Sequence, residues 1–468
     1  MKQVLIGLAV AAYSFGAISA NSVWNVQSGA TASNVNGCFF VTGASGTDRS
    51  QSNTPFATLT TLSVVSVTTT IITVSLTDYT VSATDVGNAF HEIGGTATDG
   101  WYQITAVDTG ANTWTVDRAI GTAGQTVAGN MGGACNALTT AMLSPVITNN
   151  KVYVKCDGTY TTAANILLNG SKNNILIQSY MTTQGDVGCR STIQATAGSF
   201  TIITLSDASM NGNTLDSFTL DCNNQTSSSA LSGTSGTKMY RNIVSSTCRG
   251  TAVTVNSQST CMYCTVTGQV TGISFQLSGG SAGANCIFCY VTSPTSGTSH
   301  AFSMQLSSVC NFCIGIGHAS AASSDVFNSS ASTIINSIAY NAGRDGIRFV
   351  CSSNCNPDIV YNTIIETAVG SCINAVTADL VGSMVDYNSV MCATDYTNIS
   401  AGANDVAPSA SVFVSAGTNF ALNNTAGGGA LLRGAGFPGD TGLGIGFMSM
   451  GPLQIQGGGG QRVYGGVQ

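Results

Sequence analysis

Short runs of alternating polar and apolar residues recur along the middle of the chain at a nearly constant interval. Asn336–Ile338, Asn362–Ile364 and Asn388–Val390 follow one another at intervals of 26 residues. Asp216–Phe218 and Arg241–Ile243 lie 25 residues apart and share the same pattern. Such alternation is typical of short, half-buried strands, because successive side chains of a strand point to opposite faces.

A second column of short alternating runs lies between these, so each repeat holds at least two strands separated by Ser, Gly and Asn turns. Its members are Ala252–Val255, Ile273–Phe275, Ala301–Met304, Val326–Phe327, Ile347–Phe349 and Cys372–Asn374. Repeats of this length suit leucine-rich repeats or β-solenoids, and the chain has neither a Leu framework nor a helical side. We therefore predict an all-β fold, a right-handed parallel β-helix of roughly nine coils with about 24–26 residues each.

The predicted β-helix occupies residues 135–404 and is flanked by other segments. Residues 21–134 form an N-terminal segment with a small β unit of alternating strands. Residues 405–468 are predicted to cap the last coil and to end in a Gly-rich tail, because a bare solenoid end exposes unpaired edge groups. Residues 1–20 have one Lys, an apolar stretch and small residues, which is the pattern of a secretory signal peptide cleaved before Asn21.

The surface is almost uncharged. Only 7% of the 468 residues are charged, whereas about 25% is usual. The net charge of −7 argues against nucleic-acid binding, which needs a basic footprint. Long solvent-exposed helices are also disfavoured, because they require Glu, Lys and Arg on their outer faces. Sixteen cysteines and the signal peptide together indicate a secreted or cell-surface location.

Three CxxC pairs follow the period of the repeat: Cys261 and Cys264, Cys286 and Cys289, Cys310 and Cys313. Zinc is disfavoured, because six thiols are the wrong number for one tetrahedral site and the spacing equals the structural period. Residues three apart in a strand face opposite sides, so one cysteine of each pair points outward unless a corner intervenes. We predict two stacked cysteine columns, mostly thiols; disulfides between neighbouring coils and a metal site are the alternatives.

Other positions extend this structural ladder. Asn336, Asn362 and Asn388 recur at equivalent turns, where Asn side chains hydrogen-bond along the stack and tolerate a left-handed backbone. Cys351 and Cys355 flank a short loop and are predicted to form a local disulfide. The pattern suggests no partner for seven further cysteines: Cys135, Cys156, Cys189, Cys222, Cys248, Cys372 and Cys392.

Several segments resemble a known group of proteins. They are NSVW…GCFFVTGASGTD near the start, GWYQITAVD…WTVDRAIG, KVYVKCDGTYT, QSYMTTQGD and the C-terminal GFPGDTG…SMGPLQIQ. The chain is similar in these segments to right-handed parallel β-helix repeat proteins of environmental phages and bacterial secretomes. The resemblance implies a β-helix with an inserted small β unit. It implies no catalytic motif, and the signal peptide departs from the phage members.

Few residues offer catalytic chemistry. Asp216 and Arg241 share a column and are expected to form a stacked ion pair. The weak catalytic candidates are His300 and Asp325, which are 25 residues apart, and the charge cluster of Arg344, Asp345 and Arg348. A lyase would need clustered carboxylates and a base, and a hydrolase two or three carboxylates at fixed separation. No cofactor and no metal is predicted.

We therefore expect a non-catalytic extracellular or virion-surface β-helix protein that binds surface glycans or serves as a structural spike or fibre component. The expected partner is a surface polysaccharide or a protein. Neither nucleic-acid binding nor a transmembrane span is expected, and assembly as a homotrimer is one alternative for the oligomeric state. Faces rich in hydroxyl and amide groups, with occasional aromatics such as Tyr263, Tyr290 and Tyr340, are expected to suit sugar contacts. The alternative is a polysaccharide lyase or glycoside hydrolase that acts in a lateral groove of the β-helix.

Overall fold

The computed structural model describes most of the chain as two compact units. The described residues are 18–31, 34–64, 70–186, 188–207, 209–234, 236–280, 282–294, 300–318, 324–350, 359–376 and 383–432. The first unit comprises residues 1–136 and 145–151, and the second comprises residues 137–144 and 152–468. Most of the predicted signal peptide, the Cys351–Cys355 pair and the Gly-rich tail lie outside the described residues.

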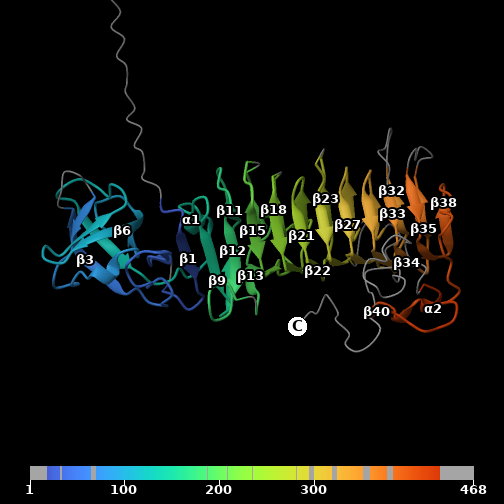
Figure 1. The fold of residues 1–468 in the computed structure, drawn as a ribbon, viewed down its shortest axis with the longest axis horizontal. Coiled ribbons are helices and arrows are strands. Elements are labelled where there is room, and N and C mark those ends of the chain that lie inside the picture. Colours follow the sequence, from blue (N-terminus) through green and yellow to red (C-terminus); the bar gives the residue numbers. More distant parts are fainter. Residues whose placement is uncertain are drawn as a thin grey trace, which may run out of the picture. The chain divides into compact units, whose positions relative to one another are not determined.

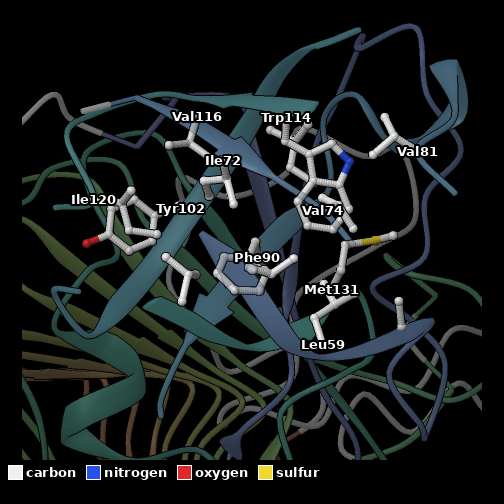
Figure 2. Close-up of a cluster of buried hydrophobic side chains, with 14 of the residues drawn as sticks. Leu59, Ile72, Val74, Val81, Phe90, Tyr102, Trp114, Val116, Ile120 and Met131 are labelled. Atoms are coloured by element: carbon white, nitrogen blue, oxygen red, sulfur yellow. The ribbon is translucent and has the colours of Figure 1, made fainter. Parts of the chain in front are cut away.

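The first unit contains a closed antiparallel barrel with strand order β3-β4-β7-β6-β5-β8. Its strands are β3 (Ala57–Val64), β4 (Ile71–Thr73), β5 (Ala89–Glu92), β6 (Gly100–Asp108), β7 (Thr113–Val116) and β8 (Thr126–Met131). Alternate residues of β3 and β7 are buried, as the alternating sequence requires. Phe90, Trp114 and Met131 converge in the barrel core (Figure 2).

Further elements of the first unit surround this barrel. The hairpin of β1 (Ser22–Val26) and β2 (Phe39–Val41) is antiparallel, and η2 (Ala83–Asp85) lies between β4 and β5. Asp85 is fully buried and accepts hydrogen bonds from the Trp114 indole and the Tyr79 hydroxyl at 3.0 and 2.6 Å. These bonds connect η2 to the barrel core.

The second unit is built from three parallel sheets whose strands alternate along the chain (Figure 1). The first sheet of this unit contains β9 (Lys151–Lys155), β12 (Leu176–Tyr180), β15 (Asn213–Asp216), β18 (Lys238–Arg241), β21 (Thr260–Met262), β24 (Asn285–Ile287), β27 (Val309–Asn311), β30 (Thr333–Ile335), β33 (Ile359–Tyr361) and β36 (Met384–Asp386). The second sheet contains β10 (Thr159–Thr162), β13 (Ser191–Ala195), β16 (Phe218–Asp221), β19 (Val244–Ser246), β22 (Thr265–Thr267), β25 (Tyr290–Thr292), β28 (Ile314–Ile316), β31 (Ile338–Tyr340), β34 (Ile364–Glu366) and β37 (Ser389–Met391).

The third sheet completes each coil. It contains β11 (Ile166–Leu168), β14 (Thr201–Leu205), β17 (Ser229–Gly233), β20 (Val253–Asn256), β23 (Phe275–Ser278), β26 (Phe302–Gln305), β29 (Phe327–Ser329), β32 (Asp345–Phe349), β35 (Ser371–Ala375) and β38 (Thr394–Thr397). Each strand pairs in parallel with the strand of the same sheet one coil later. The predicted right-handed parallel β-helix is confirmed, with three strands in each coil.

Equivalent inward side chains stack on one another along the axis of the β-helix. Phe275, Phe302 and Phe327 occupy one register column of the third sheet and are fully buried. Their ring centroids are 5.6 and 4.8 Å apart, close to the separation of neighbouring strands. The core is therefore a set of apolar columns, and each coil adds one residue to every column.

In most coils, a residue with a left-handed backbone conformation forms the corner between the first and second sheets. The corner residues have φ between 49° and 64° and are Ser217, Asn242, Tyr263, Phe288, Phe312, Asn336, Asn362 and Tyr387. Asn362 donates a hydrogen bond from its side chain to the side-chain oxygen of Asn336 at 2.6 Å. Asn388 is displaced by one position, because Tyr361 pairs with Asp386 and Tyr387 therefore occupies the corner. Asn388 is therefore not at the expected corner position, but its side chain still bonds to the preceding coil: it accepts from the Thr363 backbone N–H at 3.0 Å and donates to the Val360 carbonyl at 3.1 Å.

The corner also explains the cysteines of the CxxC pairs. Tyr263, Phe288 and Phe312 turn the chain between the two cysteines, so both members of each pair are buried. The intervening corner is the exception that the strand geometry allows, so neither cysteine of a pair points outward. Cys261–Cys264 and Cys286–Cys289 are disulfides within single coils, whereas Cys310 and Cys313 are free. Stacked thiols thus describe only the third pair.

Four further disulfides join cysteines that lie far apart or in neighbouring coils. They are Cys38–Cys135, Cys156–Cys189, Cys222–Cys248 and Cys372–Cys392. Their Cα atoms are 4.8 to 6.3 Å apart, within the usual range for a disulfide. The sequence pattern names none of these pairings, because the two cysteines of each pair do not share a position of the repeat.

The described part of the C-terminal segment packs on the outer face of the second sheet. β39 (Phe413–Ser415) and β40 (Asn419–Leu422) form a hairpin, followed by α2 (Gly429–Leu432). Phe413 and Phe420 contact Tyr340 with ring centroids 6.2 and 5.6 Å apart. Val406 pairs with Ser389 of β37 and so covers part of the last strand of this sheet. At the other end of this unit, α1 (Thr140–Leu143) packs against β11.

Candidate functional site

The outer face of the third sheet carries one continuous column of polar side chains. Its members are in register from strand to strand and are Thr204, Ser232, Thr254, Gln276, Ser303, Asn328, Arg348, Asn374 and Thr397. All but Ser303 are half-buried, so their polar ends are accessible to solvent. Successive members lie one strand apart, at about 4.8 Å. The column is a linear array of hydroxyl and amide groups with one guanidinium.

The buried carboxylate of Asp325 binds Asn328, which is one member of this column. Asp325 is fully buried, and both of its oxygens accept hydrogen bonds from Arg344, at 2.8 Å from Nε and 2.6 Å from Nη2. Asn328 donates to Asp325 Oδ2 at 3.1 Å. A bidentate pair of this kind fixes both groups, because the planar guanidinium matches the carboxylate. The Asp325 carboxylate therefore fixes the orientation of the Asn328 side chain.

A second buried carboxylate performs the same role one coil later. Asp345 accepts hydrogen bonds from Arg348 Nη1 at 2.9 Å and from the Asn374 side chain at 3.0 Å. Its other oxygen accepts from the Ser371 backbone N–H at 3.2 Å. Arg344 Nε also lies 3.8 Å from Asp345, so the two carboxylates share one ion-pair network. Three consecutive members of the polar column are thus held by Asp325 and Asp345.

His300 lies at the edge of this network. Its Nδ1 is 3.3 Å from Asp325 Oδ2, and its side chain is 16% exposed. Burial lowers the pKa of His300; the Asp325 carboxylate opposes this shift, and Arg344 and Arg348 add to it. The lowered pKa favours the neutral imidazole, and its Nδ1 accepts a hydrogen bond from the Asp325 backbone N–H at 3.4 Å.

Hydrogen bonds within the protein occupy both oxygens of each of the two carboxylates. Asp325 and Asp345 each accept at least three hydrogen bonds from named partners, and both are nearly fully buried. A catalytic carboxyl group needs an oxygen that can reach the substrate. The weak catalytic candidates His300, Asp325, Arg344, Asp345 and Arg348 do come together in the structure. They form a neutralised network that supports a polar surface.

Other residues selected from the sequence lie elsewhere. Asp216 and Arg241 meet at 2.7 Å on the first sheet, as their 25-residue separation indicates. Tyr263 stacks on Phe288 at 5.1 Å, and Tyr340 packs under the C-terminal hairpin. Tyr290 packs against the same C-terminal cluster. These three rings pack against other side chains and remain half-buried, and the expectation that they contact sugars stays a prediction.

The polar column itself was not identified from the sequence. Asn374 and Arg348 belong to runs that the repeat pattern marks, but the pattern draws attention to the inward neighbours Ile373 and Ile347. Asn328 directly follows Phe327 in the same way. The signal that could have revealed the column is the polar residue one place after each inward aromatic or β-branched residue.

Only one group of described residues has the composition of a metal site. The sulfur atoms of Cys286, Cys310 and Cys313 lie within 4.8 Å of one another and are buried. Cys286 is bonded to Cys289, however, so it offers no thiolate while that disulfide is closed. Among the described residues, no helix is long and apolar enough to span a membrane.

Comparison with known proteins finds similar solved structures but no similar sequence. No family model matches the chain, and no characterised protein sequence matches it. Pectate lyase Pel9A superposes with a TM-score of 0.43 and 12% identity, over 68% of this chain and 90% of that protein. The Dettilon tailspike protein superposes with a TM-score of 0.34 and 8% identity, over 58% of this chain and 60% of that protein.

A third neighbour is an alginate lyase from a Paenibacillus species, with a TM-score of 0.29 and 9% identity, over 57% of this chain and 94% of the lyase. At these values the likenesses carry no argument about activity. The β-helix assignment rests on the parallel register of the three sheets.

Proposed function

We propose that the chain is a non-catalytic, extracellular β-helix protein that binds a surface polysaccharide along the polar column of its third sheet. The observation that carries the proposal is the in-register run of nine polar side chains, three of which are fixed by buried carboxylates. Amides and hydroxyls both donate and accept hydrogen bonds, as sugar hydroxyls do. Side chains that are already oriented lose less conformational freedom on binding.

The charge of the network favours a neutral or weakly acidic glycan. Arg344 and Arg348 are balanced by Asp325 and Asp345, and His300 is neutral. These residues therefore do not form the strongly basic surface that would favour binding of a highly anionic polymer. Guanidinium N–H groups next to amides still supply donors for an occasional carboxylate.

The cysteines support an exported location. Six disulfides join described residues of the chain, and disulfides persist in oxidising compartments. Both a secreted protein and a virion protein that meets such a compartment are consistent with this. A role as a spike or fibre component places the same polar column on the outside of a particle.

The test compares matched double variants on two sheets. Thr254→Ala with Gln276→Ala removes neighbouring polar groups from the third sheet. Thr260→Ala with Asn285→Ala removes similar neighbours from the outer face of the first sheet and serves as the control. Binding to a panel of bacterial and plant polysaccharides is measured by isothermal titration calorimetry. We expect the third-sheet variant to bind at least tenfold more weakly and the control to bind like the wild type.

Two results would contradict the proposal. Equal loss in both variants would place binding elsewhere. Release of unsaturated or reducing sugar ends from any bound polysaccharide would instead show that the protein is a lyase or hydrolase, and the His300→Ala variant would then show whether His300 takes part.

A further inference from the structure

The three CxxC pairs of the β-helix occupy equivalent positions. Cys261 pairs in register with Cys286, and Cys286 with Cys310, on adjacent strands of the first sheet. The residues between the cysteines, Tyr263, Phe288 and Phe312, all have φ of 55°. The backbone that closes the first two pairs is therefore repeated at the third.

The side chains around the three pairs are also equivalent. The rings of Tyr263, Phe288 and Phe312 stack with centroids 5.1 and 5.0 Å apart and interplanar angles of 4° and 15°. The second cysteine of each pair places its sulfur near a backbone carbonyl of the preceding coil: Tyr240, Cys261 and Cys286, at 3.9, 3.7 and 3.5 Å. The third pair differs in having no bond between its sulfurs and in being followed in register by Ile334 instead of a cysteine.

Cys310 and Cys313 are positioned to react with each other. Both are buried, and a side-chain hydrogen bond joins them. The Cα atoms of the two closed pairs are 6.1 and 6.2 Å apart, within the usual range. Since the third pair has the same register and the same corner, closing it needs movement of the sulfur atoms rather than of the backbone.

We propose that Cys310–Cys313 is a disulfide-forming site, the third rung of a ladder that begins with Cys261–Cys264 and Cys286–Cys289. The oxidant is a small-molecule disulfide such as glutathione disulfide. The Cys310 thiolate attacks one oxidant sulfur and releases one thiolate; the Cys313 thiolate then attacks the Cys310 sulfur and releases the second. The protein loses two electrons and two protons, and the oxidant becomes two thiols. Burial raises the pKa of the Cys310 thiol in the folded chain, so the reaction takes place while the coils are assembling.

Two other outcomes are open to these sulfurs. Cys310 lies within 4.8 Å of Cys286, so exchange with the closed second rung would give a Cys286–Cys310 bond between coils. Reduction of the second rung would give four thiols from two CxxC pairs, which is the ligand set of a structural zinc site. The in-coil bond is favoured because the adjacent pair, Cys286–Cys289, and the pair one coil before it, Cys261–Cys264, already form it.

The sequence provides a direct way to assign the bonds. No Lys or Arg occurs between Arg249 and Arg344, so trypsin leaves all three pairs on one peptide. Chymotrypsin cleaves after Tyr263, Phe288 and Phe312, which separates the two cysteines of each pair. A closed rung therefore appears in mass spectrometry as two peptides joined by a disulfide. The first two rungs serve as internal controls.

The full chain is refolded with reduced and oxidised glutathione, denatured without reductant, alkylated and digested. We expect Cys310 and Cys313 to be unlabelled and their peptides to be linked, two hydrogens lighter than the sum of the free peptides. In the Cys313→Ala variant, Cys310 should become labelled while the other two rungs stay linked. This variant distinguishes a closed rung from a thiol that the reagent fails to reach.

Three results would overturn the proposal. Labelling of both Cys310 and Cys313 in the wild type would show that they stay thiols. A peptide that joins Cys286 to Cys310 would show a bond between coils. Stoichiometric zinc in protein refolded with zinc sulfate, together with labelling of all four cysteines after its removal, would show a metal site.

Discussion

The outer faces of the first and third sheets have the same backbone geometry but different chemistry. On the first sheet, one outward register column mixes polar and apolar residues, in the order Arg241, Met262, Ile287, Asn311, Ile335, Tyr361 and Asp386. On the third sheet, the corresponding column is polar throughout, from Thr204 to Thr397. Inward residues of both sheets are mostly apolar, because they build one shared core; Lys238 and Ser329 are buried polar exceptions. The fold thus fixes the inner columns, and the outer columns are free to differ in function.

The two faces also differ in how they hold charge. Each has a buried aspartate paired with an arginine: Asp216 with Arg241 at the first sheet and Asp325 with Arg344 beside the third. The Arg241 side chain is 41% exposed and makes one hydrogen bond to Asp216, whereas Arg344 makes two to Asp325 and is 32% exposed. The third-sheet pair is thus the more rigid of the two.

The largest expected effect comes from removing an arginine on each face. Arg344→Met leaves Asp325 buried with fewer partners, so we expect a loss of about 3–5 kcal/mol in the free energy of unfolding. Arg241→Met should cost about 1 kcal/mol, since Asp216 still accepts from Gln178, Asn242 and Ser217. Urea unfolding followed by circular dichroism measures both. Equal losses would show that the two faces hold charge alike.

A smaller effect on the free energy of unfolding is expected at the corner between the first and second sheets. Asn362→Ala removes the hydrogen bond to Asn336 and places a less tolerant residue at a φ of 49°. We expect the free energy of unfolding to fall by about 1–2 kcal/mol. Asn362→Gly removes the bond alone and should cost less. If Gly is as costly as Ala, the backbone conformation contributes nothing and the hydrogen bond explains the loss.

Acid should destabilise the third-sheet network through His300. Burial lowers the pKa of His300 in the folded state, so the unfolded chain binds its proton first. Stability should therefore fall as the pH drops below the unfolded value of about 6.5. In His300→Gln the fall between pH 7 and 5.5 should be shallower, as measured by urea unfolding at each pH. Parallel profiles for the two proteins would assign the pH dependence to other groups.

The smallest effects are expected at exposed positions of the outer faces. Met239→Ser on the first sheet and Gln276→Ser on the third should each change the free energy of unfolding by less than about 0.5 kcal/mol. Only Gln276→Ser should weaken polysaccharide binding in calorimetry. A binding loss with Met239→Ser would extend the site onto the first face.

Much of the fold could be predicted because each coil repeats the same pattern of buried and outward residues. The spacing of Cys261, Cys286 and Cys310 equals one coil, and the structure places them on adjacent strands. The same spacing indicates the contacts between Asp216 and Arg241 and between His300 and Asp325. Residues one period apart become neighbours in a solenoid, so sequence distance converts directly into proximity.

The site could be predicted only in part. The charged residues were visible because charge is rare in this chain, but their burial was not. Asp325 lies just before β29 and is buried because Arg344, from the turn before β32, reaches back to it. Asn388 shows the same limit, since a coil one residue shorter shifts it away from the corner.

The sequence by itself determined the period, the strand pattern and the absence of a strongly charged surface, since these depend on local alternation and composition. Only the tertiary structure decided which cysteines pair, which aromatic rings are covered and which carboxylates are buried. These depend on where turns of unequal length end. Cys222 and Cys248 meet across neighbouring coils, and Tyr340 is covered by the C-terminal hairpin. Contacts of this kind arise between turns and segments that the period does not describe.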